Sequence, residues 1–288
     1  MAPATTPLIA ILGSINLDIT LHVDDLPRPG QTVLAHHATR GLGGKGANQA
    51  AAAAQLLGTS RMIGAVGDDP EGLWLLDRLA SFGVDISMVR QDDTHPSGVA
   101  LIGVDKRGEN SIMVSPGANS TVTAPSTTTA DADALMIQFE IPLDSATQAA
   151  EDFRGFVAVN PSPTQPIPAP LIHRADLFVV NADEYHGLPE LAQAKLVAVT
   201  LGANGAEIRE NGRVTHSAPA HTVAHPANTV GAGDAFFAAF VSAIVVGHDP
   251  REALSVSTLV AAAAVADAAS QPSLGRLEDY VAQVSSGS

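Results

Sequence analysis

The 288-residue sequence contains no cysteine, which excludes disulfide bonds and thiolate metal sites. Basic residues are also scarce: 15 Lys and Arg against 30 Asp and Glu give a net charge of −15. A nucleic-acid binder needs the opposite surplus to contact phosphates. Long apolar runs are missing as well, because the most apolar stretch, 235–247, is well short of the roughly 20 residues of a membrane helix. We therefore expect neither a nucleic-acid nor a membrane partner.

A secretion signal is not evident either. Residues 1–7 are polar and lack the basic start and apolar stretch of a signal peptide, which favours a cytoplasmic location. The hydrophobic share of 45% against a charged share of 16% is typical of a folded globular chain. We expect one domain over residues 1–288.

Apolar strands alternate with helical segments along most of the chain. The expected buried strands are 8–13, 60–66, 134–139, 156–160, 177–181 and 196–200. The expected helices are 47–57, ended by Gly58; 70–82, with Asp69 as N-cap and Pro70 at its first position; and 143–153. This alternation predicts an α/β fold with a doubly wound, mostly parallel sheet that is covered on both faces.

Two stretches interrupt the alternation. Strand-like runs at 19–23 and 32–36 are joined by turn residues, and 98–104 and 111–114 flank a hairpin turn. We expect these four strands to form a small β-sheet lid, with lid segments at about 16–42 and 97–115, that excludes water from a site. Two ordinary surface hairpins are the alternative. A further hairpin at 210–213 is expected at a sheet edge.

The run N-T-V-G-A-G-D at 228–234 directly precedes an apolar helix. Small residues before a helix allow backbone N–H groups to point at an anion, assisted by the helix dipole. Asp234 would repel a phosphate that is merely bound, but it suits a base that takes a proton from an attacking hydroxyl. An ordinary helix start with an acidic first turn is an equally good reading of these residues alone.

A second glycine-rich run, G-L-G-G-K-G-A-N-Q-A, occupies 41–50. Gly41, Gly43 and Gly46 formally match a dinucleotide-binding turn, so an NAD-dependent dehydrogenase is one alternative. That turn needs a preceding core strand, whereas 33–40 is polar. Lys45 is not followed by Ser or Thr, which excludes a Walker A sequence. The run suits close approach to a polyhydroxylated ligand.

Asn16 and Asp18 follow the first strand and face the same side of an extended chain. Carboxylate and amide groups together can bind vicinal hydroxyls. Taken alone, this pair is better explained as a polar strand end with an Asx turn.

In this order and spacing, the runs at 13–18, 43–50 and 231–234 resemble the ribokinase branch of the PfkB carbohydrate kinase family, and the resemblance covers nearly the whole chain. It implies ATP-dependent phosphorylation of the primary hydroxyl of a pentose, above all D-ribose to D-ribose 5-phosphate. Another sugar or a nucleoside as acceptor, or a non-catalytic sugar-binding sensor with this fold, are the alternatives.

The resemblance also implies roles for individual residues. The sugar would be held by Asn16, Asp18, Gly44, Lys45, Asn48 and Glu140. Asp234 would be the catalytic base, with Gly231, Ala232 and Gly233 as the anion hole. The nucleotide site would include Asn181, Thr200, Gly202 and Gly205, and Glu184 would hold Mg²⁺ through water. A homodimer formed through the lid is implied as well.

The chain departs from the family at three places. Potassium-activated members carry Asp where this chain has Asn228, and a neutral amide weakens a cation site built from oxygens. The segments near 185–195 and 266–273 are shorter than their counterparts beside the nucleotide.

Overall fold

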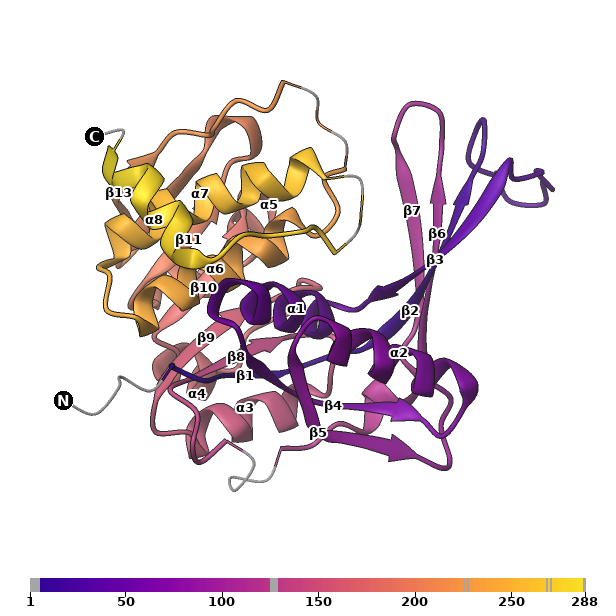
Figure 1. Ribbon diagram of the computed structural model, residues 1–288, viewed down its shortest axis with the longest axis horizontal. Helices are drawn as coiled ribbons and strands as arrows, with labels where there is room; N and C mark the ends of the chain where they lie inside the picture. The colour runs from indigo at the N-terminus through magenta and orange to yellow at the C-terminus, as the bar shows by residue number, and fades with distance from the viewer. Residues whose placement is uncertain are drawn as a thin grey trace.

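The computed structural model describes residues 6–124, 129–224, 226, 228–267, 269 and 271–286. In this part of the chain a nine-stranded sheet has the order β13-β12-β11-β10-β9-β8-β1-β4-β5 (Figure 1). Its strands are β1 (Ile9–Leu12), β4 (Ser60–Gly67), β5 (Val84–Asp92), β8 (Ala134–Gln138), β9 (Phe156–Asn160), β10 (Leu177–Asn181), β11 (Val197–Thr200), β12 (Ala206–Glu210) and β13 (Arg213–Ala218). All neighbours pair in parallel except β11 with β12 and β12 with β13. The predicted α/β class is confirmed.

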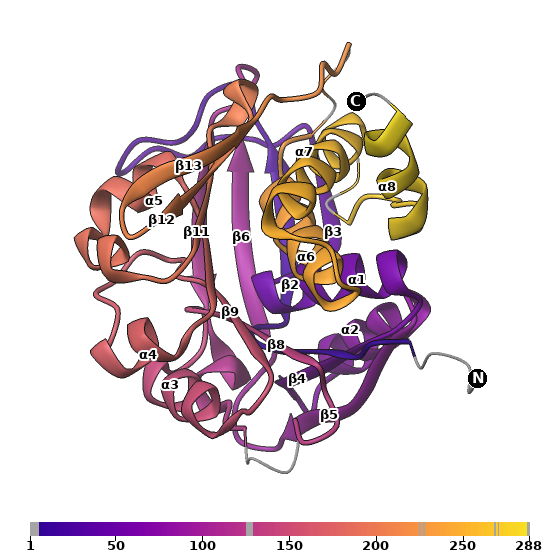
Figure 2. The same ribbon diagram turned by 90° about the vertical axis from the view of Figure 1, so that its left-hand side faces the viewer.

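Helices cover both faces of this sheet (Figure 2). One face carries α1 (Lys45–Leu57), α2 (Pro70–Ser81), α6 (Ala232–Val245), α7 (Pro250–Ala266) and α8 (Leu277–Ser286). The other carries α3 (Leu143–Asp152), α4 (Ala169–Arg174) and α5 (Ala182–Gly187). Strand alternation divides the core, because Ile9 and Ile11 of β1 pack toward the first set while Ala10 and Leu12 pack toward the second.

The predicted helix boundaries hold to within about two residues, the usual precision of such limits. Asp69 caps α2 by accepting a hydrogen bond from the Gly72 backbone N at 2.6 Å, with Pro70 at the first position. Gly58 ends α1 in the left-handed conformation. The turn at 210–213 joins β12 to β13 at one edge of the sheet, as expected, and Asn211 takes a positive φ there. The described residues also include the 3-10 segments η1 (Gly117–Thr121), η3 (Pro189–Gln193) and η4 (Gly202–Asn204).

A separate sheet of four strands, called the small sheet below, projects from the main body (Figure 1). Its order is β3-β2-β6-β7, with β2 (Asn16–His22), β3 (His37–Gly43), β6 (Gly98–Val104) and β7 (Asn110–Ser115). Strands β2 and β6 run in parallel, and each also pairs with an antiparallel edge strand. The second sheet was predicted and is confirmed.

One strand of the small sheet was predicted at the wrong place. The expected strand 32–36 is not formed; instead β3 covers His37–Gly43, pairing His22 with His37. Leu34, an apolar residue within the expected strand, is 88% exposed. An edge strand with two accessible faces accepts polar residues such as Arg40, so apolar content is a poor guide to its position.

The two faces of the small sheet differ in what they carry. Cross-strand partners share a face, so Asp18, Ala100 and Val114 lie on one face and Leu101 and Met113 on the other. The first face continues into the turn between β1 and β2.

Within the described residues, the fold contains no helix that is both long and apolar enough to cross a membrane.

Candidate active site

Three segments that are far apart in sequence meet beside the carboxyl end of β1. The turn after β1 contacts the start of α1, where the Ala47 backbone N donates a hydrogen bond to the Ser14 carbonyl at 2.9 Å. The start of α1 in turn meets the start of α6, where Asn48 Nδ2 donates to Asp234 Oδ2 at 3.1 Å across 186 positions. The structure therefore brings together the three runs that the sequence analysis singled out.

Glycines make this close approach possible. Gly44, the N-cap of α1, has a φ of 85°, which favours glycine. A Cβ at Gly46 would lie 2.6 Å from the Ser14 backbone N. The backbones of the β1 turn and of α1 can touch only because no side chain stands between them.

The residues predicted to hold a sugar lie around this junction. They are Asn16 and Asp18 on β2, Gly44 at the N-cap of α1, Lys45 and Asn48 in its first turns, and Glu140 two residues beyond β8. Glu140 connects two of these segments. Its Oε2 accepts hydrogen bonds from the Lys45 backbone N at 3.0 Å and from Ser14 Oγ at 2.5 Å.

Lys45 is surrounded by acidic groups. Burial by itself lowers the pKa of its ammonium, but the charges of Asp234, Glu140 and Glu184 act in the opposite direction and leave this pKa above its usual value. Lys45 therefore stays positively charged at neutral pH. The contribution of Glu184 places the start of α5 within electrostatic reach of Lys45.

The carboxyl group of Asp18 is perturbed more strongly. Burial, followed by the like charges of Glu140 and Asp234, raises the pKa of Asp18 to about 7. A carboxyl group that titrates near neutrality can either accept two hydrogen bonds or hold a proton under ordinary conditions. Such behaviour is typical of a ligand-binding site.

Asp234 lies in the first turn of α6 and is only 9% exposed. Gly231 is the N-cap in the left-handed conformation, and Ala232 and Gly233 are the first two helical residues. Backbone N–H groups in a first turn have no partner within the helix, and the helix dipole adds positive potential there. The site thus offers donors for an anion directly beside a carboxylate.

Five polar residues to which the sequence analysis gave no role support the site: Ser14, Gln49, Asn119, Gln138 and Gln271. Asn119 is buried and holds the base of β2, donating to Asn16 Oδ1 at 2.8 Å and accepting from the Ile15 backbone N at 2.9 Å. Gln271 Nε2 donates to Asn48 Oδ1 at 2.7 Å and also bonds the Leu42 carbonyl.

Two of these five could have been found from sequence. Gln49 stands within the alanine run of α1, and Gln138 ends the otherwise apolar strand β8. Both are completely buried. A buried amide at the carboxyl edge of a parallel sheet is a signal of a ligand site, because ligands of such sheets bind at that edge.

The residues predicted for the nucleotide lie along the same edge of the sheet. Asn181 ends β10 and Thr200 ends β11, and the two are register partners. Gly202 and Gly205 flank the short turn after β11 with positive φ angles. A Cβ at Gly205 would lie 2.1 Å from a backbone oxygen of β13, so this turn requires glycine.

Asn181 and Glu184 form a reciprocal capping box. Glu184 N donates to Asn181 Oδ1, and Asn181 N donates to Glu184 Oε2, both at 2.8 Å. The helix that follows, α5, is six residues long and is followed by η3.

Asn228 begins the loop that enters α6. Its Oδ1 accepts a hydrogen bond from the Val230 backbone N at 2.9 Å. Of the neighbouring segment 266–273, positions 268 and 270 lie outside the described residues.

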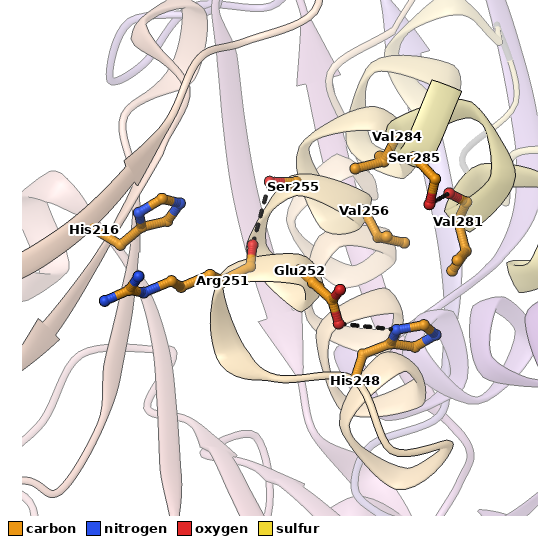
Figure 3. A pocket seen from close by; sticks show the side chains of 9 residues that line it. All are labelled: His216, His248, Arg251, Glu252, Ser255, Val256, Val281, Val284 and Ser285. Carbon is orange, nitrogen blue, oxygen red and sulfur yellow. Dashed lines mark hydrogen bonds and ion pairs between the residues drawn. The ribbon is translucent and has the colours of Figure 1, made fainter. Parts of the chain in front are cut away.

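A hollow of about 270 Å³ between β13, α7 and α8 does not include any of the predicted residues (Figure 3). Several of its polar groups pair with one another: His248 Nδ1 lies 3.2 Å from Glu252 Oε2, and Ser255 donates to the Arg251 carbonyl. We therefore place the candidate site at the α1–α6 junction, where buried charges converge, and not in this hollow.

Comparison with known proteins shows similarity to carbohydrate kinases along nearly the whole chain. The family model described as pfkB family carbohydrate kinase matches residues 6–275. A ribokinase of Schizosaccharomyces pombe is 32% identical over 89% of this chain and 91% of its own length. A deoxyribokinase of Salmonella typhi is 30% identical over 94% of this chain and 97% of its own. The structure of Arabidopsis thaliana ribokinase complexed with ribose and ATP superposes with a TM-score of 0.88 at 28% identity, covering 97% of this chain and 99% of that one.

Proposed function

The chain belongs to the pfkB family of carbohydrate kinases, and from this premise we propose that it phosphorylates the primary hydroxyl of D-ribose to give D-ribose 5-phosphate. As a member of this family it is a sugar kinase, a phosphotransferase with an alcohol acceptor that uses ATP as co-substrate. Membership of this family rules out the NAD-dependent dehydrogenase that was considered as an alternative. In addition, Gly41 and Gly43 lie in edge strand β3 of the small sheet, whereas a dinucleotide-binding turn follows a core strand.

The observation that carries the proposal is the hydrogen bond between Asn48 and Asp234 at the start of α6. It joins a residue proposed to hold the sugar to the carboxylate proposed as the base. In the proposed reaction Asp234 accepts the proton of the acceptor hydroxyl as its oxygen attacks the γ-phosphorus of ATP. The bond from that phosphorus to the β,γ-bridging oxygen breaks, and ADP leaves.

The remaining residues orient the reactants and stabilise charge. The backbone N–H groups of Gly231, Ala232 and Gly233 would face the transferring phosphoryl group. The hydroxyls of the sugar would bind the polar group made of Asn16, Asp18, Gly44, Lys45, Asn48 and Glu140. Asn181, Thr200, Gly202 and Gly205 would line the nucleotide site along the same edge of the sheet.

Mg²⁺ fits this arrangement if it arrives with the phosphates of ATP. Among the described residues no three His, Asp or Glu side chains gather so as to hold a metal ion by themselves. Kinases hold Mg²⁺ mainly through phosphates and water, with one or two protein carboxylates. The Glu184 carboxylate uses one oxygen in its capping bond and is half-buried, so its other oxygen suits a water-mediated contact. Bound there, Mg²⁺ would neutralise charge on the phosphates.

A potassium site fits less well. The neutral side chain of Asn228 already uses its oxygen to accept a hydrogen bond from Val230. We therefore propose a reaction without a potassium requirement.

The small sheet is proposed to act as a lid over the sugar and as the contact of a homodimer. The face of the small sheet that carries Asp18 lies next to the proposed site. Its other face and its edge strand β7 expose apolar side chains, among them Leu101, Ile112 and Met113. An exposed apolar edge strand favours pairing with a second copy.

The experiment that tests the proposed function is an ADP-release assay with Mg-ATP and a panel of acceptors: D-ribose, 2-deoxy-D-ribose, hexoses and nucleosides. We expect the highest kcat/KM for D-ribose. A higher value for deoxyribose, the substrate in the name of one relative, would replace ribose by that sugar. Absence of turnover with every acceptor, from folded protein that binds ribose, would contradict catalysis and favour a sugar sensor.

A further inference from the structure

Behind Asp234 lies a row of two buried amides. Gln49 Nε2 donates to Asp234 Oδ1 at 2.9 Å, and Gln138 Nε2 donates to Gln49 Oε1 at 2.5 Å. Both glutamines are completely inaccessible to solvent. They come from different elements, α1 and β8, so the row connects the start of α6 to the central strands of the sheet.

The order of donors and acceptors in this row runs in one direction. An ionised carboxylate only accepts hydrogen bonds, so Gln49 must turn its NH₂ group toward Asp234. Its oxygen then faces Gln138, which must in turn present its own NH₂ group. The oxygen at the end of the row, Gln138 Oε1, has no hydrogen-bond partner among the described residues. It is pressed against the backbone at Gly13, where an added Cβ would approach it to 1.9 Å.

Stability alone does not explain this row. A buried amide oxygen without a partner lowers the free energy of unfolding, whereas an apolar side chain of similar size would avoid that cost. The donors do, however, favour one state of Asp234: ionised, with Oδ1 held from behind and Oδ2 turned toward Asn48 and the sugar side.

We propose that Gln49 and Gln138 are positioning residues that keep Asp234 ionised and aim Oδ2 at the acceptor hydroxyl. The inference rests on the proposed role of Asp234 as the base. The other groups facing this carboxylate are Asp18 from β2 and Lys45 and Asn48 from α1.

Two variants test the row. Gln138→Met removes the donor to Gln49 and the partnerless oxygen together, without adding charge. We expect kcat to fall about 5- to 10-fold, the scale of one hydrogen bond between neutral groups, with KM for sugar and ATP unchanged. We expect the melting temperature to stay the same or rise. Gln49→Glu places a second carboxyl group beside Asp234, and Gln138 continues to donate to it.

In Gln49→Glu the two neighbouring carboxyl groups cannot both ionise easily, so the acidic limb of the kcat–pH profile should move up by about one pH unit or more. The pH titration of the Asp234 ¹³Cγ resonance in ligand-free protein should shift upward in the same way. This resonance is assigned by its absence from the spectrum of Asp234→Asn. That readout does not depend on which acceptor is used. The matched control is Gln148→Glu on α3, an exposed position on the opposite face of the sheet, which should change neither profile.

The outcomes separate this inference from the function on which it rests. If Asp234→Asn turns over at nearly the wild-type rate, the base assignment is wrong and the inference with it. A second outcome would overturn the positioning role alone. In it, Asp234→Asn is inactive, but Gln138→Met and Gln49→Glu keep the wild-type kcat, kcat–pH profile and ¹³Cγ titration of Asp234. A lowered melting temperature with unchanged kcat per folded molecule would likewise show a purely structural role.

Discussion

The carboxylate of Asp18 occupies the space in which a side chain at Gly43 would begin. A Cβ at Gly43 would approach Asp18 Oδ1 to 1.9 Å. The two residues belong to neighbouring strands of the small sheet, β2 and β3, at the end nearest the proposed sugar site. The glycine therefore determines where this carboxylate points.

The variant Gly43→Ala should displace Asp18 and lower kcat/KM for the sugar by about 10- to 100-fold, the effect of a misplacement of about 1 Å. The control is Gly41→Ala in the same strand, where an added Cβ would meet no atom within 4 Å. Steady-state kinetics with varied sugar and varied ATP would check this. Equal effects of the two variants would show that Asp18 is not placed by Gly43.

The raised pKa of Asp18 links stability to pH. In the unfolded chain this carboxyl titrates near 3.8, whereas in the fold burial, Glu140 and Asp234 raise its pKa to about 7. The folded state thus binds the proton more tightly, and the stabilisation that the protonated group contributes is lost as pH rises between these values.

Asp18→Asn should therefore raise the free energy of unfolding of the ligand-free protein by about 1–3 kcal/mol at pH 8 and by clearly less at pH 5. Urea unfolding at the two pH values would measure the difference. Asp152→Asn, at an exposed position on α3, serves as the control. A gain of the same size at both pH values would contradict the coupling.

Asp234→Asn should lower kcat by about 10²- to 10⁴-fold, the usual contribution of a positioned base. The fold should survive, because the amide keeps the shape of the carboxylate and its oxygen can still accept from Gln49 or Asn48. ADP release and circular dichroism on the same preparation would check both halves of this prediction. Turnover close to wild type would remove Asp234 from the proposed mechanism.

The main sheet was predictable because its strands are buried on both faces. Continuous apolar runs such as β9 and β10 were placed at their observed limits from composition and flanking turns. The edge strand β3 was misplaced because it is largely exposed, and burial no longer dictates which residues it contains. Pairing with β2, a long-range relationship, fixes its position instead.

The site was predictable only as separate runs. The resemblance brought 13–18, 43–50 and 231–234 together, and the structure places them in contact. The supporting residues Asn119 and Gln271 could not be recognised in this way, because their role depends on hydrogen bonds to residues more than a hundred positions away. Local periodicity contains no information about such partners.

The proposed dimer predicts that Met113→Lys, on the exposed face of the small sheet, weakens self-association about 10-fold or more, as truncation or charging of an interface anchor does. The control is Leu73→Lys on α2, which is similarly exposed but lies on the main body. Sedimentation velocity over a concentration series would compare them. A wild-type protein that sediments as a monomer would contradict the dimer.

The neutral side chain of Asn228 predicts equal initial rates of ADP release in potassium chloride and in tetramethylammonium chloride at the same ionic strength. Asn228→Asp is the informative variant, because a carboxylate at this position would supply the negative charge that the Asn228 amide lacks for binding a cation. Marked stimulation of the wild-type enzyme by potassium would show that other oxygen atoms complete the cation site.

The hydrogen bonds from α1 to Asp234 span 186 and 185 positions of the chain. During synthesis on a ribosome, α1 therefore leaves the exit tunnel long before α6, the helix against which it packs, has been made. A product released early would contain most of the proposed sugar-binding segment but no base. Incomplete chains would then be unable to consume ATP, because the proposed base is translated after the residues proposed to hold the sugar.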